Sequence, residues 1–245
     1  MLINLINPNT SPGMTECIHQ AALAVCSHGV QLRSVHPTQG TPSIESYLEE
    51  AIATTGVIEQ VIAGEKLGCQ AHILACFGDP GLDAARELAQ APVIGIAEAA
   101  MHSASLLGHK FSIVTTLSRT LAMSEHLVHK YGFAQRCAGI SAVDIAVLDL
   151  HNPASQAYER ILKACQQAVE EQGADTLILG CAGMADLNQR LSQALGVPVV
   201  DGVSSAVGLA EMLIRCGLST SKRHAYALPP QKCYTGWAAE TINPI

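Results

Sequence analysis

Residues 72–100, HILACFGDPGLDAARELAQAPVIGIAEAA, follow a plan that recurs at residues 177–206, LILGCAGMADLNQRLSQALGVPVVDGVSSA. Each copy has an apolar strand that ends in a cysteine, then one residue and a glycine, then a helix that contains Arg and Leu. A Pro-Val strand and a helix rich in small residues follow. The cysteine precedes the proline by 16 positions in the first copy and by 17 in the second. Internal repetition of this kind predicts two similar structural units.

The remainder of the chain extends this plan into an α/β fold, because short apolar runs alternate with longer helical patterns. We expect helices at 43–66, 82–90, 118–131 and 154–171, and a further helix that begins near Pro12. The expected strands are 2–6, 30–36, 72–77, 93–97, 111–116, 176–181 and 197–201.

Together these elements predict two similar parallel-sheet α/β domains related by pseudo-twofold symmetry, with the active site in the cleft between them. Residues 1–108 form the domain that carries Cys76, and residues 109–216 form the domain that carries Cys181. We expect the C-terminal tail, residues 217–245, to pack back on the first domain.

The composition excludes several classes of partner. The 245 residues are 49% hydrophobic and 14% charged, with a net charge of -7 and no block of Lys or Arg. Nucleic acid and membrane surfaces are therefore poor partners. Residues 1–5 have no basic start followed by a long apolar run, so we expect a cytoplasmic protein. The nine cysteines are an odd number in a long chain, and we expect reduced thiols.

Candidate functional residues lie where the predicted strands end. Asn7, Cys76, Thr115 and Cys181 all fall at the carboxyl ends of strands, which is where parallel sheets bind ligands. If the halves pack about a twofold axis, the two cysteines face each other across the cleft. One thiolate can then remove a proton from one face of a carbon acid while the other thiol returns a proton to the opposite face. This chemistry is racemisation through a planar enolate.

Cysteine suits this reaction only if a thiolate is accessible. An ordinary thiol with a pKa of about 8.5 is only ~3% ionised near pH 7, so we expect the site to lower one pKa. Each cysteine precedes a loop into a helix, whose N-terminal N–H groups favour an anion. The N–H groups of Phe77, Gly78, Ala182 and Gly183 are placed to hold the carbonyl oxygens of the substrate as charge develops on them.

Several polar residues have a structural interpretation that competes with a functional one. Asn7, Asn9 and Thr10 either cap the helix that begins near Pro12 or contact the ligand. Thr115 and Thr116 either satisfy a turn between strand and helix or contact the ligand.

Two acidic residues are also ambiguous. For Asp79 we favour capping of the helix that starts near Gly81 over a role as a catalytic carboxylate. Glu98 and His102 lie one helical turn apart, and we favour an ordinary exposed pair over a base and its orienting partner.

The sequence contains no convincing cofactor or metal motif. Cys17-x-His19 and Cys26-x-His28 sit on a helical pattern and lack the paired spacing of a zinc site. No dinucleotide-binding or P-loop motif occurs. We therefore expect neither a metal nor a cofactor.

Seven segments together resemble the hydantoin and allantoin racemases of the aspartate/glutamate racemase superfamily. The resemblance extends from residue 3 to about residue 236. It implies two α/β domains, no cofactor, a homo-oligomer, and Cys76 and Cys181 as the acid–base pair. It also implies that Asn9, Ile44, Gly78, Thr115, Thr116 and Gly183 border the bound ring. The segments are INPNTS (6–11), PSIES (42–46), ACFGDPGL (75–82), PVIGIAEAAMH (92–102), FSIVTT (111–116), LGCAGMADL (179–187) and PVVDGVSSAV (198–207).

The implied substrate is a small cyclic ureide. Residues 75–121 look most similar to allantoin racemases, so we favour allantoin over hydantoins with an alkyl or aryl group at the ring stereocentre. Residues 36–42 and the Ala185-Asp186 turn depart from the pattern. A different class of function is a non-catalytic two-lobed protein that binds a small polar solute. A redox dithiol is a third alternative, in which the sulfurs would lie within disulfide reach and leave no room for a ring.

Overall fold

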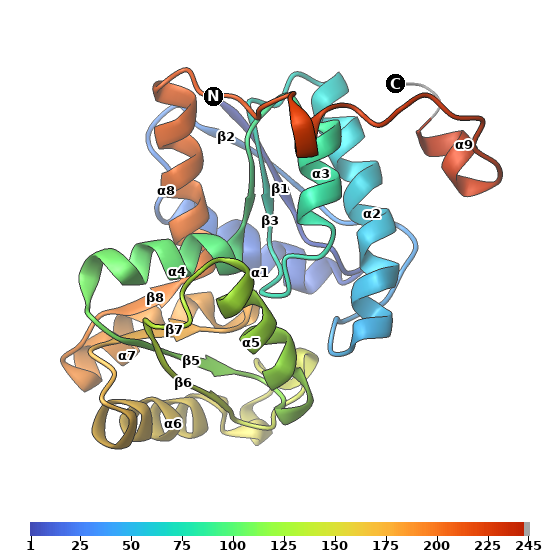
Figure 1. Ribbon diagram of the computed structural model, residues 1–245. Coiled ribbons are helices and arrows are strands. Elements are labelled where there is room, and N and C mark those ends of the chain that lie inside the picture. The colour runs from blue at the N-terminus through green and yellow to red at the C-terminus, as the bar shows by residue number, and fades with distance from the viewer. Residues whose placement is uncertain (243–245) are drawn as a thin grey trace.

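Two parallel sheets with the same strand order form the framework of the chain (Figure 1). The computed structural model describes residues 1–242. The order is β2-β1-β3-β4 in the first sheet and β6-β5-β7-β8 in the second, so the predicted α/β class with two similar sheets is confirmed. The strands are β1 (Leu2–Ile6), β2 (Gln31–Val35), β3 (Ala71–Leu74), β4 (Val93–Gly95), β5 (Phe111–Thr115), β6 (Cys137–Ala142), β7 (Thr176–Leu179) and β8 (Val199–Asp201).

Helices cover both sheets and begin where the sequence supplies caps. Ser11 caps the first helix, with Pro at its first position, and Ser46 caps the second. The helices are α1 (Pro12–Leu23), α2 (Tyr47–Lys66), α3 (Leu82–Leu88), α4 (Ile96–Leu107), α5 (Leu121–Lys130), α6 (Ala157–Gln172), α7 (Asn188–Leu195), α8 (Gly202–Arg215) and α9 (Trp237–Thr241), with short 3-10 helices at Ser118–Thr120, Val147–Asp149, Pro153–Ser155, Ala182–Leu187 and His224–Tyr226.

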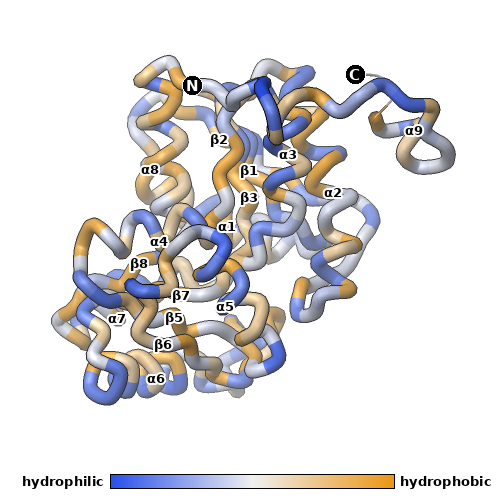
Figure 2. Tube along the Cα trace, in the orientation of Figure 1, coloured by the Kyte–Doolittle hydropathy of each residue, from blue (hydrophilic) through white to orange (hydrophobic). Residues whose placement is uncertain are grey.

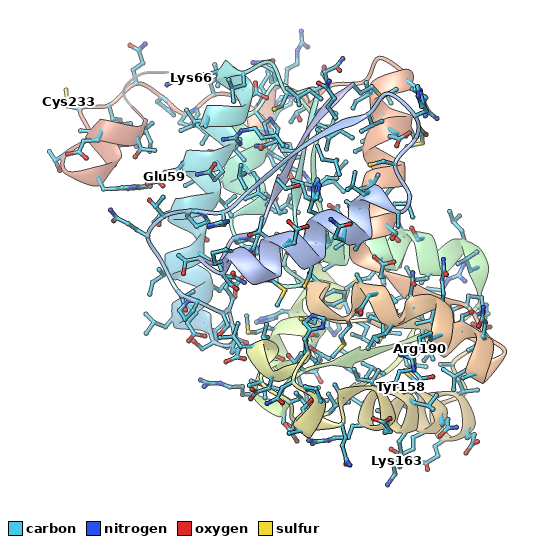
Figure 3. All side chains as sticks on the ribbon, turned by 180° about the vertical axis from the view of Figure 1, so that it is seen from behind. Glu59, Lys66, Tyr158, Lys163, Arg190 and Cys233 are labelled. Atoms are coloured by element: carbon cyan, nitrogen blue, oxygen red, sulfur yellow. The ribbon has the colours of Figure 1, made fainter. Side chains whose placement is uncertain are left out.

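The inner strands β3 and β7 are mostly apolar, with one buried polar residue each, His72 and Thr176. Every residue of β3 and of β7 is buried, as expected for parallel strands covered on both faces. Figure 2 shows hydrophobic residues along the strands and along α4, with hydrophilic residues mainly on the outer helices. In the second half, α6 and α7 also meet through Arg190, whose guanidinium carbon lies 4.0 Å from the centre of the Tyr158 ring (Figure 3).

The fourth helix of each half crosses to the other sheet. A boundary at residue 108 separates the strands of the two sheets, but α4 packs on β7 and β8, whereas α8 packs on β3, β4 and α1. The two crossing helices also pack on each other. Their first residues, Ile96 and Gly202, meet so closely that a Cβ on Gly202 would lie 2.5 Å from the carbonyl oxygen of Ile96. The two sheets are therefore joined by a shared helical layer.

The structure corrects the expected strands at several points. Strand β6 was not expected, because its sequence, CAGISA, is poor in β-branched residues and all of it is only half-buried at the edge of the sheet. The strands expected over 72–77 and 176–181 end at Leu74 and Leu179. Cys76 and Cys181 therefore lie two residues beyond their strands rather than at the last strand position.

The C-terminal segment returns to the first half of the chain. The Lys222 ammonium group donates to the carbonyl oxygens of Arg86 and Glu87 at 2.6 and 3.1 Å. Further along, the indole N–H of Trp237 donates to Glu59 of α2 at 2.5 Å, and Figure 3 shows Glu59 on the side of the molecule where this segment lies. Residues 243–245 of the expected tail lie outside the described residues. Within residues 1–242, every helix is too short or too polar to cross a membrane.

Candidate active site

A cavity of about 630 Å³, including the part open to solvent, lies between the two sheets. Its walls come from the loops that follow β1, β3, β5 and β7, so the carboxyl ends of both sheets face it. It is lined by Asn9, Met14, Ile44, Ala75, Cys76, Phe77, Gly78, Thr115, Thr116, Thr120, Met123, Ser124, Val147, Gly180, Cys181 and Ala182.

The cavity brings together most of the residues that the sequence singles out. Nine of them are in its lining, namely Cys76, Cys181, Asn9, Ile44, Phe77, Gly78, Thr115, Thr116 and Ala182. Asn7 and Gly183 are not in the lining. The Asn7 amide instead donates to the Asn9 side-chain oxygen at 2.8 Å and to Thr15 Oγ1 at 3.0 Å. Asn7 therefore orients the side chain of Asn9, which does line the cavity.

Gly183 lies behind the cavity wall. A Cβ added there would meet the side chains of Leu150 and Met14 at 2.9 and 3.2 Å. Its backbone N–H group nevertheless opposes the rise in the pKa of Cys181 that burial causes. Gly183 thus influences the pKa of Cys181 but does not line the cavity.

The two cysteines occupy equivalent places in the two sheets. Cys76 follows β3 and Cys181 follows β7, each by two residues, and both line the same cavity. They are close enough that a thiolate at Cys181 raises the pKa of Cys76. Both residues are partly exposed, and this exposure is to the cavity between the sheets.

Burial raises the pKa of both thiols, which corrects the expectation that the site lowers one of them. The pKa of Cys76 rises to about 12 and that of Cys181 to about 11, mainly because burial removes the water that would solvate a thiolate. The N–H groups of Gly78 and Gly183 oppose this effect but are outweighed. No helix dipole acts at Cys76, because α3 begins only at Leu82.

The structure tests the capping roles expected for some of the ambiguous polar residues and gives a hydrogen-bond partner for Thr115. The side chain that caps α1 belongs to Ser11, which accepts from the Met14 N–H at 3.2 Å, so neither Asn7 nor Asn9 caps that helix. The Thr115 hydroxyl donates to the carbonyl oxygen of Gly180 at 3.2 Å, and this bond ties the loops after β5 and β7 together.

Asp79 caps a helix, but not the expected one. The N-cap residue of α3 is Gly81, and no side chain caps this helix. The Asp79 carboxylate instead accepts from the N–H groups of Ala97 and Glu98 at the start of α4, both at 3.1 Å. The cap differs because the loop after Cys76 folds over the end of β4 rather than along α3.

Glu98 and His102 do not act as a pair. The Glu98 carboxylate forms an ion pair with Arg86 at 2.5 Å. The His102 ring packs edge-on against Phe133, with 5.0 Å between ring centres. Neither residue is in the lining of the cavity.

Several lining residues were not predicted from the sequence. Gly180 directly precedes Cys181 and could have been included with the repeated pattern. The others reach the cavity from α1, from α5 and its preceding turn, and from the 3-10 helix after β6. They are Met14, Thr120, Met123, Ser124 and Val147, together with Ala75 beside Cys76.

This arrangement can move protons at a bound carbon acid. Two thiols reach one cavity from opposite sheets, and hydroxyl, amide and backbone N–H groups surround them. Within residues 1–242, no three His, Cys, Asp or Glu side chains are grouped so that they could hold a metal ion.

The chain is similar to known racemases over nearly its whole length. The family model described as Asp/Glu/Hydantoin racemase matches residues 3–210. A hydantoin racemase from Pseudomonas sp. (strain NS671) is 43% identical, over 96% of this chain and 95% of that protein. The structure of an allantoin racemase from Klebsiella pneumoniae is 51% identical with a TM-score of 0.96 and covers 98% of each chain. That of an allantoin racemase from Pseudomonas fluorescens is 41% identical with a TM-score of 0.93, over 96% of this chain and 100% of that chain.

Proposed function

The chain belongs to the Asp/Glu/hydantoin racemase family and is a racemase, and we propose that it racemises allantoin with Cys76 and Cys181 as its two acid–base groups. The observation that carries this proposal is that the two cysteines line one cavity from equivalent positions in the two sheets. Two like groups on opposite faces of a stereocentre can work in both directions by exchanging roles.

The proposed reaction begins with one cysteine as thiolate and the other as thiol. The thiolate takes the proton from the ring stereocentre, the C–H bond breaks, and its electron pair moves into an enolate with the adjacent carbonyl group. The second thiol then gives its proton to the opposite face of the planar carbon. The product leaves with inverted configuration, and the two cysteines have exchanged protonation states.

The raised pKa of the thiols affects this scheme in two ways. A pKa of about 11 leaves roughly one thiolate in 10⁴ molecules at pH 7, so ionisation costs free energy. The thiolate that forms is correspondingly more basic, which suits the removal of a proton from a weak carbon acid. The backbone N–H groups of Gly78 and Gly183 offset part of the cost, and those of Phe77 and Ala182 are candidates to stabilise the enolate oxygen.

Two considerations favour allantoin over other hydantoins. The allantoin racemase from Klebsiella pneumoniae is 51% identical to this chain, whereas the hydantoin racemase from Pseudomonas sp. and the allantoin racemase from Pseudomonas fluorescens are 43% and 41% identical. The cavity also has polar groups that suit a ureido substituent, since its lining includes the Asn9 amide and the hydroxyls of Thr116, Thr120 and Ser124. Racemisation of hydantoins with an apolar substituent is the alternative.

We further propose that the reaction uses neither a metal nor a cofactor and that the enzyme works in the cytoplasm as a homo-oligomer. Proton transfer between two thiols and a carbon acid requires no electron acceptor or Lewis acid. Dialysis against EDTA should therefore leave the rate of racemisation unchanged. A loss of activity that zinc restores would contradict this part of the proposal.

The direct test is to incubate each enantiomer of allantoin with the protein in D₂O. Optical rotation should fall to zero while deuterium enters at the stereocentre, faster than in buffer alone. A parallel assay with 5-benzylhydantoin should be slower, and the reverse order would favour the alternative substrate class. Binding of allantoin without any loss of rotation would instead favour a non-catalytic binding protein and overturn the proposal.

A further inference from the structure

We infer that Asp79 is a positioning residue for Cys76. It attaches the turn that contains this cysteine both to the crossing helix α4 and to the second half of the chain. The inference rests on the proposed two-cysteine reaction. It concerns a residue outside the cavity lining, which would act on the substrate only through Cys76.

Asp79 joins three separate parts of the structure. Its side chain is buried, with 4% exposure, and its carboxylate accepts three hydrogen bonds. Two come from the N–H groups of Ala97 and Glu98 in α4, and the third comes from the Tyr131 hydroxyl at 2.7 Å. Tyr131 follows α5, which belongs to the second half of the chain. Asp79 therefore anchors the loop after β3 to both sides of the boundary between the sheets.

The backbone of Asp79 closes the turn that holds the cysteine. Its N–H donates to the carbonyl oxygen of Cys76 at 3.0 Å, so residues 76–79 form a tight turn. Within this turn the backbone N–H of Gly78 opposes the rise in the pKa of Cys76. Asp79 also has a φ of 44°, in the left-handed region that few residues other than Gly, Asn and Asp adopt. Anchoring Asp79 thus fixes both the sulfur and the N–H group that favours its thiolate.

The second half of the chain caps its crossing helix differently. There the N-cap residue itself, Asp201, accepts from the Ser204 N–H at 2.8 Å. The matching N-cap of α4 is Gly95, whose φ and ψ of -83° and 140° resemble the -100° and 147° of Asp201. A Cβ on Gly95 would overlap the Asp79 carboxylate.

The cap of α4 is therefore supplied by the cysteine turn instead of by the end of its own strand. If capping were the only role, an aspartate at position 95 could cap α4 in the same way as Asp201 caps α8. The residue that lies three positions after Cys181, as Asp79 does after Cys76, is Met184, which has no carboxylate. The helix cap is thus a residue of the cysteine turn itself only in the half that carries Cys76. In the other half the Asp201 carboxylate accepts from the Asn188 amide at 2.7 Å, at the end of the 3-10 helix that follows Cys181.

Loss of this anchor has a specific consequence for the reaction. For the enantiomer whose proton faces Cys181, inversion requires a proton from a correctly placed Cys76. If Cys76 is displaced, Cys181 takes the proton, its new S–H exchanges with D₂O, and the resulting S–D returns deuterium to the same face. The substrate then gains deuterium without inversion.

The test compares Asp79→Gly with the exchange variant Asp79→Gly/Gly95→Asp. Glycine tolerates the left-handed φ at position 79, and removal of the carboxylate makes room for Asp at position 95. The readouts are Tm and, for each allantoin enantiomer in D₂O, the ratio of deuterium exchange to inversion. Asp201→Ala serves as a control that removes a helix cap and a bond from Asn188 in the second half, and leaves the turn after Cys76 unchanged.

We expect Asp79→Gly to lower Tm and to raise the ratio about tenfold or more for one enantiomer, since small misplacements of a reacting group cost up to about 10²-fold in rate. The exchange variant should recover Tm but keep the raised ratio, and Asp201→Ala should lower Tm with the ratio for that enantiomer unchanged. A wild-type ratio in Asp79→Gly, or full recovery of the ratio in the exchange variant, would reduce Asp79 to a helix cap and overturn the inference.

Two further measurements keep the test decisive. If Asp79→Gly does not fold, Tyr131→Phe removes only one donor to the carboxylate and should still raise the ratio for the same enantiomer, and an unchanged ratio overturns the inference. Wild-type protein in the same assay separates the two claims. Inversion by the wild type with unaltered ratios in the variants defeats the inference alone, whereas no inversion by the wild type defeats the proposed function.

Discussion

The carboxylate of Glu45 accepts a hydrogen bond from the backbone N–H of Val147 at 2.7 Å, across 102 positions of sequence. Glu45 belongs to the loop before α2, and Val147 begins the 3-10 helix after β6. Ile44, beside Glu45, and Val147 itself both line the cavity. This bond therefore joins the two halves at the cavity wall.

Replacement of Glu45 should loosen this wall and weaken substrate binding. A hydrogen bond to a charged group is worth about 1.5–3 kcal/mol, so Glu45→Ala should raise KM about tenfold or more, with a smaller change in kcat. Glu45→Gln keeps the acceptor oxygen while it removes a charge that raises the pKa of Cys181, and its KM should stay near that of the wild type. Equal KM values for the two variants in steady-state assays would contradict this account.

Each cysteine should be required for inversion. Cys76→Ser and Cys181→Ser should each lower the rate of racemisation by about 10²–10⁴, because a serine hydroxyl is a far weaker acid and base than a thiol. Each variant should retain deuterium exchange on the enantiomer that faces its remaining cysteine, measured by loss of the NMR signal from the stereocentre. Cys216→Ser, at an exposed position, is the matched control. Inversion at the wild-type rate by either active-site variant would refute the two-cysteine scheme.

The reactivity of both thiols should rise steeply with pH. Because burial raises the pKa of Cys76 to about 12 and that of Cys181 to about 11, the thiolate fraction grows about tenfold per pH unit from pH 7 to pH 10. Alkylation by iodoacetamide, followed at each cysteine by mass spectrometry, should therefore accelerate over this range without a plateau. A plateau below pH 9 in the ligand-free protein would show that another group lowers one pKa.

Ser124 should help to select the substrate. Its side chain comes from α5 and lines the cavity, where the hydroxyl can bond a ureido group but gains nothing from a methyl group. Ser124→Ala should lower kcat/KM for allantoin about two- to tenfold and leave that for 5-methylhydantoin nearly unchanged, since a lost hydrogen bond costs about 0.5–1.5 kcal/mol. Equal losses for the two substrates would place the ureido group elsewhere in the cavity.

The repeated pattern around Cys76 and Cys181 predicted most of the fold and the two residues at the centre of the candidate site. Central strands of parallel sheets are continuous apolar runs, so β3 and β7 were visible locally, and the residues that follow them were expected to meet. Strand β6 was not visible, because an edge strand of small residues has no hydrophobic pattern. Val147, shortly after β6, was missed with it.

Features that depend on packing between distant segments were beyond the reach of local patterns. The sequence shows that Asp79 can cap a helix, but the choice of α4 depends on how the loop folds over β4. The pKa direction at Cys76 depends on its burial in the folded chain. Likewise, nothing in the sequence of α4 or α8 indicates which sheet each helix covers.

The crossing of α4 and α8 makes a glycine necessary at the start of α8. A Cβ on Gly202 would lie 2.5 Å from the Ile96 carbonyl oxygen and 2.8 Å from the Ile96 Cβ, so the backbones must separate to admit it. Gly202→Ala should therefore lower the free energy of unfolding by about 1–3 kcal/mol, as overpacking does in buried sites.

Gly208 on the same helix provides the matched control for this prediction. An added Cβ there meets nothing within 4 Å, so Gly208→Ala should stabilise the protein by up to about 1 kcal/mol through helix propensity. Urea denaturation of both variants measures the difference. Because the two substitutions add the same methyl group to one helix, opposite signs would locate the effect of Gly202→Ala in the contact with α4, and equal stabilities would show that the two helices separate at no cost.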